Sequence, residues 1–285
     1  MVPGKDTNTV YLTERLRTDE RYCKAHDRLT GILEKHSVQV KYLRDSKIRD
    51  IWCRDFMPVQ IGQGRFVQFR YEPSYLVGYE AHRTNPEEVS EARQCQPVLS
   101  DINLDGGNIV NCFDRAIVTD RIFDENPGFT SKTKLVSAIE KLLEAEVIVI
   151  PQINSDLTGH ADGMVRFVGR DTLLGNHRDH EYKYWTKGIN RVLKAYGIQY
   201  IDIPFGYYHI KGHSDHAIGC YVNYLEVGNL MVVPIFGYEP VKDEAVVKLF
   251  HEIFPDRIIE SVNYNEVGLE GGLLNCSTWT IKEES

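Results

Sequence analysis

The feature that most constrains this chain is a unit that recurs about five times along it: a polar turn, a pair of strands, a helix and a returning strand. Short apolar or alternating runs mark the strands, and apolar residues at 3.6-residue spacing mark the helices. Recurrence of one such unit favours a closed ring of modules over a doubly wound sheet. In a ring, each polar turn would lie at the same end of the central axis, so residues distant in sequence would meet in one pocket.

The periodicity predicts the elements, and the last unit needs both ends of the chain. We expect the strand at 8–12 to complete the hairpin that follows Cys276. Residues 72–100 are polar and irregular, which predicts a long surface loop with one helical piece near 86–93. The other expected elements are helices at 19–36, 131–144, 181–196 and 242–253, and strands at 38–43, 65–71, 116–118, 147–150, 164–168, 172–174, 199–203, 220–225, 230–234 and 257–262.

Composition limits the partners of the chain. Its 285 residues suffice for one large domain, which we place at 1–285. The net charge of −8 argues against nucleic acid, which needs a basic face, and suits a small cationic substrate. No glycine-rich phosphate-binding turn follows a strand, so a nucleotide is not expected.

Targeting signals and cysteine usage bear on the compartment. The first residues show no basic-then-apolar leader, and no apolar run approaches ~18 residues, so we expect no membrane segment. The six cysteines include no CxxC pair, which predicts reduced thiols in the cytoplasm rather than a disulfide framework. Oligomeric state stays open, with a homo-oligomer among the possibilities.

Four of the polar turns carry residues that could perform chemistry. A thiol such as Cys276 becomes a nucleophile as the thiolate, and His160 could activate it and then act as acid and base. Asp55 and Asp162 would repel each other in a dry pocket unless a cation lay between them. A planar guanidinium fits that position because it pairs with carboxylates along more than one edge. Asp105, in a further turn, is the remaining candidate.

Each of these residues also has a structural explanation when taken alone. Cys276 could be a buried thiol at a strand end, and Asp105 a turn residue bonded to nearby amides. A cluster of His209, His213 and His216 could bind zinc, although Gly212 interrupts any helix that would align two of them, and a polar loop at the pocket mouth is the favoured interpretation. The joint occurrence of the candidates, in register with the repeat, is what favours a catalytic site.

Six stretches of the sequence together are specific: WCRDFMP at 52–58, LDGGN at 104–108, GHADG at 159–163, CYVNY at 220–224, FPDR at 254–257 and GGLLNC at 271–276. They resemble stretches of one enzyme family, the agmatine deiminase and bacterial peptidylarginine deiminase group. The similarity extends over roughly residues 8–280, nearly the whole chain. It implies the five-bladed α/β propeller, or pentein fold, of guanidino-modifying enzymes.

The resemblance implies roles for individual residues. Cys276 would be the nucleophile and His160 the acid and base, while Asp55 and Asp162 would clamp the guanidinium and act in catalysis. The resemblance also places three further residues at the substrate: Trp52, Asn223 and Gly272.

Departures from the family pattern concern the surroundings of these residues. Asp105 lies where the family usually has a glutamate that orients the histidine, and we expect its shorter side chain to reach His160 only through water or not at all. Asn275 replaces a histidine and Gly163 an asparagine. The stretch FRYEP at 69–73 lacks the tryptophan and asparagine of agmatine enzymes.

The activity so implied is hydrolytic deimination of agmatine to N-carbamoylputrescine and ammonia, a step of putrescine and polyamine biosynthesis, with no cofactor and no metal. The alternatives are deimination of peptidylarginine or another small guanidine, amidino transfer, and guanidine binding without catalysis. A substrate with a free carboxylate would need a cation in the pocket. The arginines available for that role are Arg54, Arg70 and Arg166.

Overall fold

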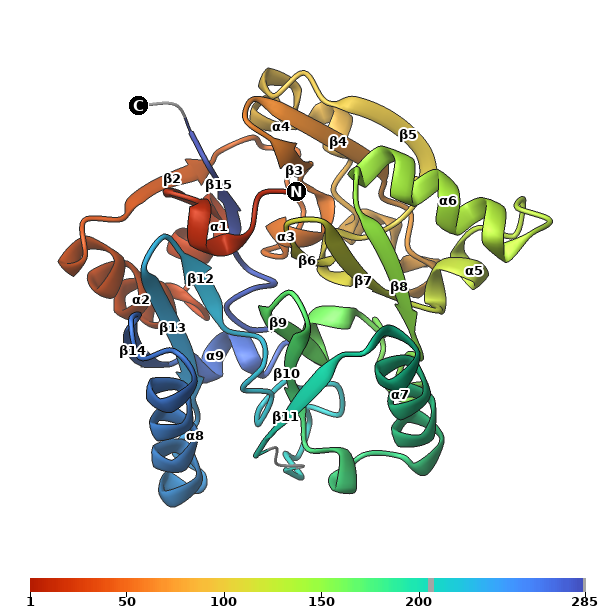
Figure 1. Cartoon of the computed structure of the whole chain (residues 1–285). Coiled ribbons are helices and arrows are strands. Elements are labelled where there is room, and N and C mark those ends of the chain that lie inside the picture. The colour runs from red at the N-terminus through yellow and green to blue at the C-terminus, as the bar shows by residue number, and fades with distance from the viewer. Residues whose placement is uncertain (205–207, 284–285) are drawn as a thin grey trace.

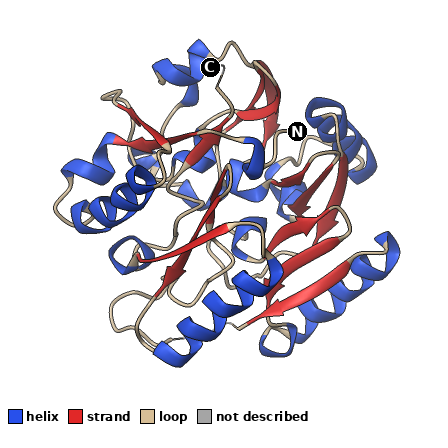
Figure 2. Cartoon of the chain, turned by 60° about the vertical axis from the view of Figure 1, so that its left-hand side comes forward, coloured by secondary structure: helices blue, strands red, loops and turns tan. Residues whose placement is uncertain are grey.

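The computed structural model describes residues 1–204 and 208–283. Its strands form five sheets of three strands each. Figure 1 shows these sheets around a common centre, with the longer helices on the outside. The view in Figure 2, coloured by secondary structure, again places the longer helices at the periphery. This arrangement confirms the five-bladed α/β propeller.

All five blades share one internal topology. An inner strand pairs antiparallel with a middle strand, and the middle strand pairs parallel with an outer strand. Parallel neighbours need a crossover connection, which the helices supply. In the order inner, middle, outer, the blades are β3 (Val59–Gly62), β4 (Arg65–Arg70) and β5 (Val98–Asn103); β6 (Val110–Cys112), β7 (Arg115–Thr119) and β8 (Glu146–Ile150); β9 (Val165–Gly169), β10 (Thr172–Asn176) and β11 (Gln199–Ile203); β12 (Leu225–Val227), β13 (Leu230–Ile235) and β14 (Ile258–Asn263); and β15 (Trp279–Ile281), β1 (Thr9–Thr13) and β2 (Gln39–Leu43).

Apolar spacing fixes the longer crossover helices against their blades. In α7, Trp185, Ile189 and Leu193 recur every fourth residue and are buried, and the helix ends at Gly197, whose φ of 65° suits glycine. The α-helices are α1 (Glu14–Thr18), α2 (Cys23–Lys35), α3 (Cys53–Phe56), α4 (Ser90–Gln94), α5 (Arg121–Glu125), α6 (Lys132–Leu143), α7 (Lys183–Tyr196), α8 (Pro240–Ile253) and α9 (Asn265–Gly268). The 3-10 helices are η1 (Gly4–Asp6), η2 (Ser74–Leu76), η3 (Glu80–His82), η4 (Pro86–Glu88), η5 (Gly106–Asn108), η6 (Ala161–Gly163) and η7 (Arg178–His180).

The two ends of the described chain close the ring. Strand β15 pairs antiparallel with β1, with Tyr11 opposite Trp279 and Thr9 opposite Ile281. The rings of Tyr11 and Trp279 lie 4.9 Å apart, and Trp279 Nε1 donates to the Pro58 carbonyl of the next blade. The prediction that the N-terminal strand completes the last hairpin is therefore confirmed.

Two predicted segments were wrong. Residues 98–100 were assigned to a surface loop but belong to β5, whose Val98 and Leu99 are more than half exposed. An outer strand of this kind lacks the buried alternation that identifies strands in sequence. Residues 220–225 were predicted as a strand, yet β12 begins only at Leu225. The preceding residues form a turn because the side chain of Asn223 bonds the backbone of another blade, at Asn275.

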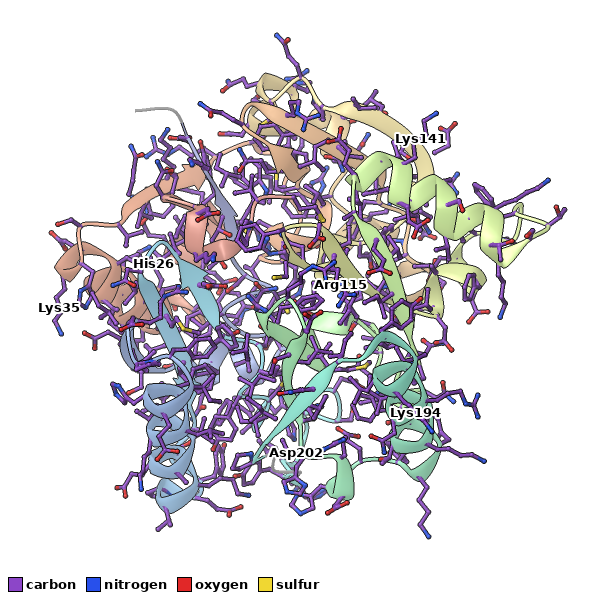
Figure 3. The ribbon with its side chains drawn as sticks, in the orientation of Figure 1. His26, Lys35, Arg115, Lys141, Lys194 and Asp202 are labelled. Atoms are coloured by element: carbon purple, nitrogen blue, oxygen red, sulfur yellow. The ribbon has the colours of Figure 1, made fainter. Side chains whose placement is uncertain are left out.

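A buried arginine joins two neighbouring blades. Arg115 on β7, labelled in Figure 3, pairs with Glu146 at 2.8 Å and with Asp171, in the β9–β10 turn, at 2.6 Å. In the same view Lys141 and Lys194 mark the outer helices α6 and α7. None of the helices within residues 1–204 and 208–283 is long and apolar enough to cross a membrane.

Candidate active site

A turn precedes the inner strand of every blade, and these five turns build one site. Side chains from four of these turns line a cavity of about 490 Å³, and the turn at η5 is connected to it through Asp105, which bonds His160. The turns are α3 before β3, η5 before β6, η6 before β9, residues 220–224 before β12 and residues 271–277 before β15. The predicted site residues in the cavity lining are Trp52, Asp55, His160, Asp162, Asn223, Gly272 and Cys276.

Asp105 is absent from that lining and contacts the cavity through His160. Its Oδ2 lies 2.8 Å from Nε2 of His160, a direct hydrogen bond between two buried side chains. The expectation that Asp105 would reach His160 only through water or not at all was therefore wrong. Asp105 stands in extended conformation just before η5, and the contact to η6 brings its short side chain within reach.

Tyr75 completes this arrangement and was not predicted. Its hydroxyl donates to the same Oδ2 of Asp105 at 2.9 Å. Tyr75 lies in η2, inside the stretch that the sequence assigned to a surface loop, and its ring packs edge-on against His160 at 6.0 Å. A lone tyrosine in a polar segment carries no sequence signal for such a contact.

The charge on His160 follows from the carboxylates around it. Burial lowers the pKa of the imidazole, but Asp55 and the hydrogen-bonded Asp105 outweigh burial, so the pKa of His160 is raised. Nδ1 of His160 lies 3.6 Å from Oδ1 of Asp55. Burial raises the pKa of Asp55, which the positive charge on His160 opposes. The acids on both ring nitrogens hold His160 as the imidazolium, which makes it a proton donor.

Cys276 is held by two polar side chains from other blades. Nδ2 of Asn223 donates to its Sγ at 3.1 Å, and the thiol donates to Oδ2 of Asp162 at 3.6 Å. Burial, followed by the charges of Asp162 and Asp55, raises the pKa of the Cys276 thiol well above its usual range. Burial and the two acids therefore keep the thiol neutral, and a cation bound beside it would favour the thiolate.

Asn223 and Asn275 fix the turn that carries the thiol. Oδ1 of Asn223 accepts from the backbone N–H of Asn275 at 3.0 Å and of Cys276 at 3.3 Å. The side chain of Asn275 donates to Oδ2 of Asp162 at 2.7 Å. The residue at the position of the family histidine thus orients one of the two predicted clamp carboxylates.

Close packing at the turns accounts for two glycines. A Cβ on Gly106 would lie 2.0 Å from the Arg54 carbonyl oxygen, and one on Gly272 would lie 2.5 Å from the Trp52 ring. Real side chains do not approach so closely, so neither position accepts a larger residue without movement. Gly272 in this way lets the Trp52 ring lie directly against the cysteine turn.

The cavity is lined by acids. Beside Asp55 and Asp162, its walls carry five further carboxylates, and neither lysine nor arginine occurs among the described lining residues. The arginines considered for a substrate carboxylate lie elsewhere: Arg54 and Arg166 line a different cavity, and Arg70 is exposed beside Glu72. The five additional acids are Asp50, Asp156, Glu181, Asp215 and Glu270.

The histidine cluster lies in a loop, and one of its members lines the cavity. His216 lines the cavity, but its Nε2 bonds the Tyr208 carbonyl at 2.7 Å and its Nδ1 accepts from Ile218 at 3.1 Å. His213 bonds the Leu269 carbonyl, and His209 is exposed. In the part of the chain that the structure describes, no three His, Cys, Asp or Glu side chains are grouped to hold a metal. The preceding residues 205–207 lie outside the described residues.

Comparison with known proteins agrees with this geometry. The model of the Porphyromonas-type peptidyl-arginine deiminase family matches residues 8–281. A relative named "Putative agmatine deiminase" from Photobacterium profundum is 24% identical over 280 residues, which cover 81% of this chain and 75% of the relative.

Solved structures share the fold. An agmatine deiminase from C. jejuni superposes with a TM-score of 0.82 at 16% identity, covering 100% of this chain and 96% of that one. An agmatine deiminase of Enterococcus faecalis gives 0.78 at 17% identity, covering 99% and 96%.

Proposed function

Because this chain belongs to the Porphyromonas-type peptidyl-arginine deiminase family, whose relatives hydrolyse C–N bonds of amidines, we propose that it deiminates agmatine to N-carbamoylputrescine and ammonia. The observation that carries the proposal is the composition of the cavity. A thiol, an imidazolium and two carboxylates face one space whose described lining contains no lysine or arginine. Such a cavity favours a cation that can form ion pairs with both carboxylates.

Substrate binding would prepare the nucleophile. A guanidinium between Asp55 and Asp162 brings a positive charge beside Cys276, where burial and the two acids hold the thiol neutral. The cation lowers the thiol pKa and so favours the thiolate. Binding also places the central guanidinium carbon near Sγ, and such positioning contributes on the order of 7–11 kcal/mol in favourable cases.

The first half-reaction would release ammonia. The Cys276 thiolate attacks the guanidinium carbon and forms a tetrahedral adduct. His160, protonated because Asp55 and Asp105 face its two nitrogens, gives its proton to the departing nitrogen. The C–N bond breaks, ammonia leaves, and an amidino group remains bound to Sγ as a thiouronium.

The second half-reaction would use the histidine in its other form. Neutral His160 takes a proton from water, and the resulting hydroxide attacks the thiouronium carbon. Collapse of that adduct breaks the C–S bond and releases the ureido product and the cysteine. General acid and base transfer of this kind typically contributes roughly 10²–10⁴-fold. All six cysteines are free in the structure, which fits the reduced state that a catalytic thiol needs.

The charge of the cavity also supports the choice of agmatine over arginine. The two molecules share the guanidinium, but arginine adds a carboxylate that would face the acidic walls without a lysine or arginine among the described lining residues. A buried charge without a partner costs about 2–5 kcal/mol. The second amine of agmatine is a cation and suits these walls.

A substrate panel tests the proposal. Agmatine, arginine and a blocked arginine peptide are supplied separately, and ammonia, free amine and ureido product are followed. We expect kcat/KM for agmatine to exceed that for arginine by about 10²-fold. Release of the alkyl amine in place of ammonia would indicate amidino transfer. No product from any of the three would remove the proposed reaction.

A further inference from the structure

A second cavity lies inside the ring of the five inner strands. It has a volume of about 70 Å³, and every inner strand contributes to its wall. None of its described lining residues lines the cavity of Cys276. Representative wall residues are Gln60 of β3, Asn111 of β6, Phe167 of β9, Glu226 of β12 and Thr280 of β15.

Two arginines face this space without a carboxylate partner. Arg54 donates from Nε to the Asn275 carbonyl and from Nη2 to the Thr280 hydroxyl, both at 3.3 Å. Arg166 donates from Nη1 to the Tyr224 carbonyl at 3.0 Å, and its guanidinium lies over the Tyr224 ring. Within residues 1–204 and 208–283, neither arginine forms an ion pair.

The acid in the wall is already engaged. Glu226 pairs with Arg257 at 2.9 Å, so it does not neutralise Arg54 or Arg166. The hydrogen bonds of the two facing arginines go to uncharged oxygens and use only part of the donor fork of each guanidinium. The remaining N–H donors and the positive charges of Arg54 and Arg166 are therefore available to one small cavity.

Repulsion between the two arginines opposes this arrangement. Burial, followed by the charge of Arg166, lowers the pKa of Arg54. Asp162 in the active site offsets part of the charge on Arg54. Arg166 forms no ion pair within residues 1–204 and 208–283. Like charges that share one small cavity are stabilised when an anion lies between them.

We propose that the cavity between Arg54 and Arg166 binds a small tetrahedral dianion of the phosphate or sulfate class. Two guanidinium forks match the charge and the oxygen geometry of such an ion. The cavity lies back to back with the active site, because Asn275 bonds Arg54 through its carbonyl and Asp162 through its side chain. The proposal is independent of which guanidine the enzyme accepts.

Thermal unfolding of the full chain with inorganic phosphate tests the site. Sodium phosphate is added in increasing concentration while sodium chloride keeps the ionic strength constant. A parallel series uses sodium sulfate. A ligand that binds only the folded state raises Tm in proportion to its occupancy. We expect a saturable rise of about 3 °C with phosphate or sulfate and none with chloride.

Three variants identify the site. Arg166→Gln should abolish the rise, while Arg170→Gln, at an exposed arginine paired with Asp114, should retain it. Thr280→Asp places a carboxylate where Arg54 now bonds a hydroxyl, so it should also suppress the rise, and it serves if Arg166→Gln does not fold. The proposal would be overturned if phosphate did not raise the Tm of the wild type, or if the rise did not saturate. It would also be overturned if Arg166→Gln and Thr280→Asp both showed the same rise as the wild type.

Discussion

Asp105 and His160 form a direct hydrogen bond, with Oδ2 of the acid 2.8 Å from Nε2 of the ring. The other ring nitrogen faces Asp55 at 3.6 Å. His160 therefore has an acid at each nitrogen, which fixes its ring orientation and raises its pKa. We propose that the shorter acid at position 105 performs the orienting role that the family resemblance gives to a glutamate.

Asp105→Asn should slow turnover and change its pH dependence. Asp105 raises the pKa of His160, so its loss lowers that pKa and the imidazolium is deprotonated at lower pH. We expect kcat to fall by about 10²-fold and the alkaline limb of the kcat–pH profile to move to lower pH. Asp105→Glu, which keeps the charge, should retain more activity. An unchanged profile in Asp105→Asn would contradict the assigned role.

Tyr75→Phe should shift the same profile in the opposite direction. The Tyr75 hydroxyl donates to Asp105, so its removal leaves the carboxylate more basic and raises the pKa of His160. A single hydrogen bond of this kind corresponds to a change in kcat of about 2–10-fold. Steady-state kinetics across pH measure both effects, with Tyr79→Phe, at a largely exposed tyrosine, as the matched control. A shift of the alkaline limb to lower pH would contradict an effect of Tyr75 on His160 through Asp105.

Asp162→Asn should make Cys276 more reactive while turnover is lost. The Asp162 charge helps to raise the thiol pKa, so its removal lowers that pKa and increases the thiolate fraction at every pH below it. We expect alkylation by iodoacetamide at pH 7 to accelerate about 10-fold, one pKa unit. In the wild type the rate should climb steadily as the pH is raised from 7. The exposed Asp101→Asn serves as control, and slower alkylation in Asp162→Asn would be incompatible with these electrostatics.

Gly106→Ala should destabilise the fold. The added Cβ would meet the Arg54 carbonyl oxygen at 2.0 Å, and a backbone atom between two blades cannot turn away. Overpacking of this kind costs about 1–3 kcal/mol in the free energy of unfolding. Urea denaturation compares it with Gly169→Ala, where a Cβ meets nothing within 4 Å. Equal free energies of unfolding for the two variants would contradict this prediction, because they would show that the backbone at Arg54 can move away from the added Cβ.

The sequence was sufficient to predict the ring and most of its site. Recurrence of the unit implied that turns distant in sequence share one end, and Asp55, His160, Asp162 and Cys276 do line one cavity. The pairing of β1 with β15 followed because the last hairpin lacked a strand. These features depend on local periodicity and order along the chain, which a sequence displays.

What the sequence could not predict depends on tertiary contacts. Whether Asp105 reaches His160 depends on how closely η5 packs on η6. The difference that matters is the length of one methylene group, by which aspartate is shorter than glutamate. Tyr75 enters the site from an irregular segment without periodic apolar spacing. The turn at 220–224 contains apolar residues typical of a strand, but the bond between Asn223 and Asn275 holds it against the cysteine turn.

The central claim is that Cys276 forms a covalent intermediate with the substrate. Intact-protein mass spectrometry after rapid acid quench of the wild type with agmatine tests it directly, with Cys276→Ala as the control that should fold, bind agmatine and form no adduct. We expect a protein heavier by agmatine minus ammonia, with the added mass on the peptide that contains Cys276. Turnover without any such adduct, or turnover by Cys276→Ala, would contradict it.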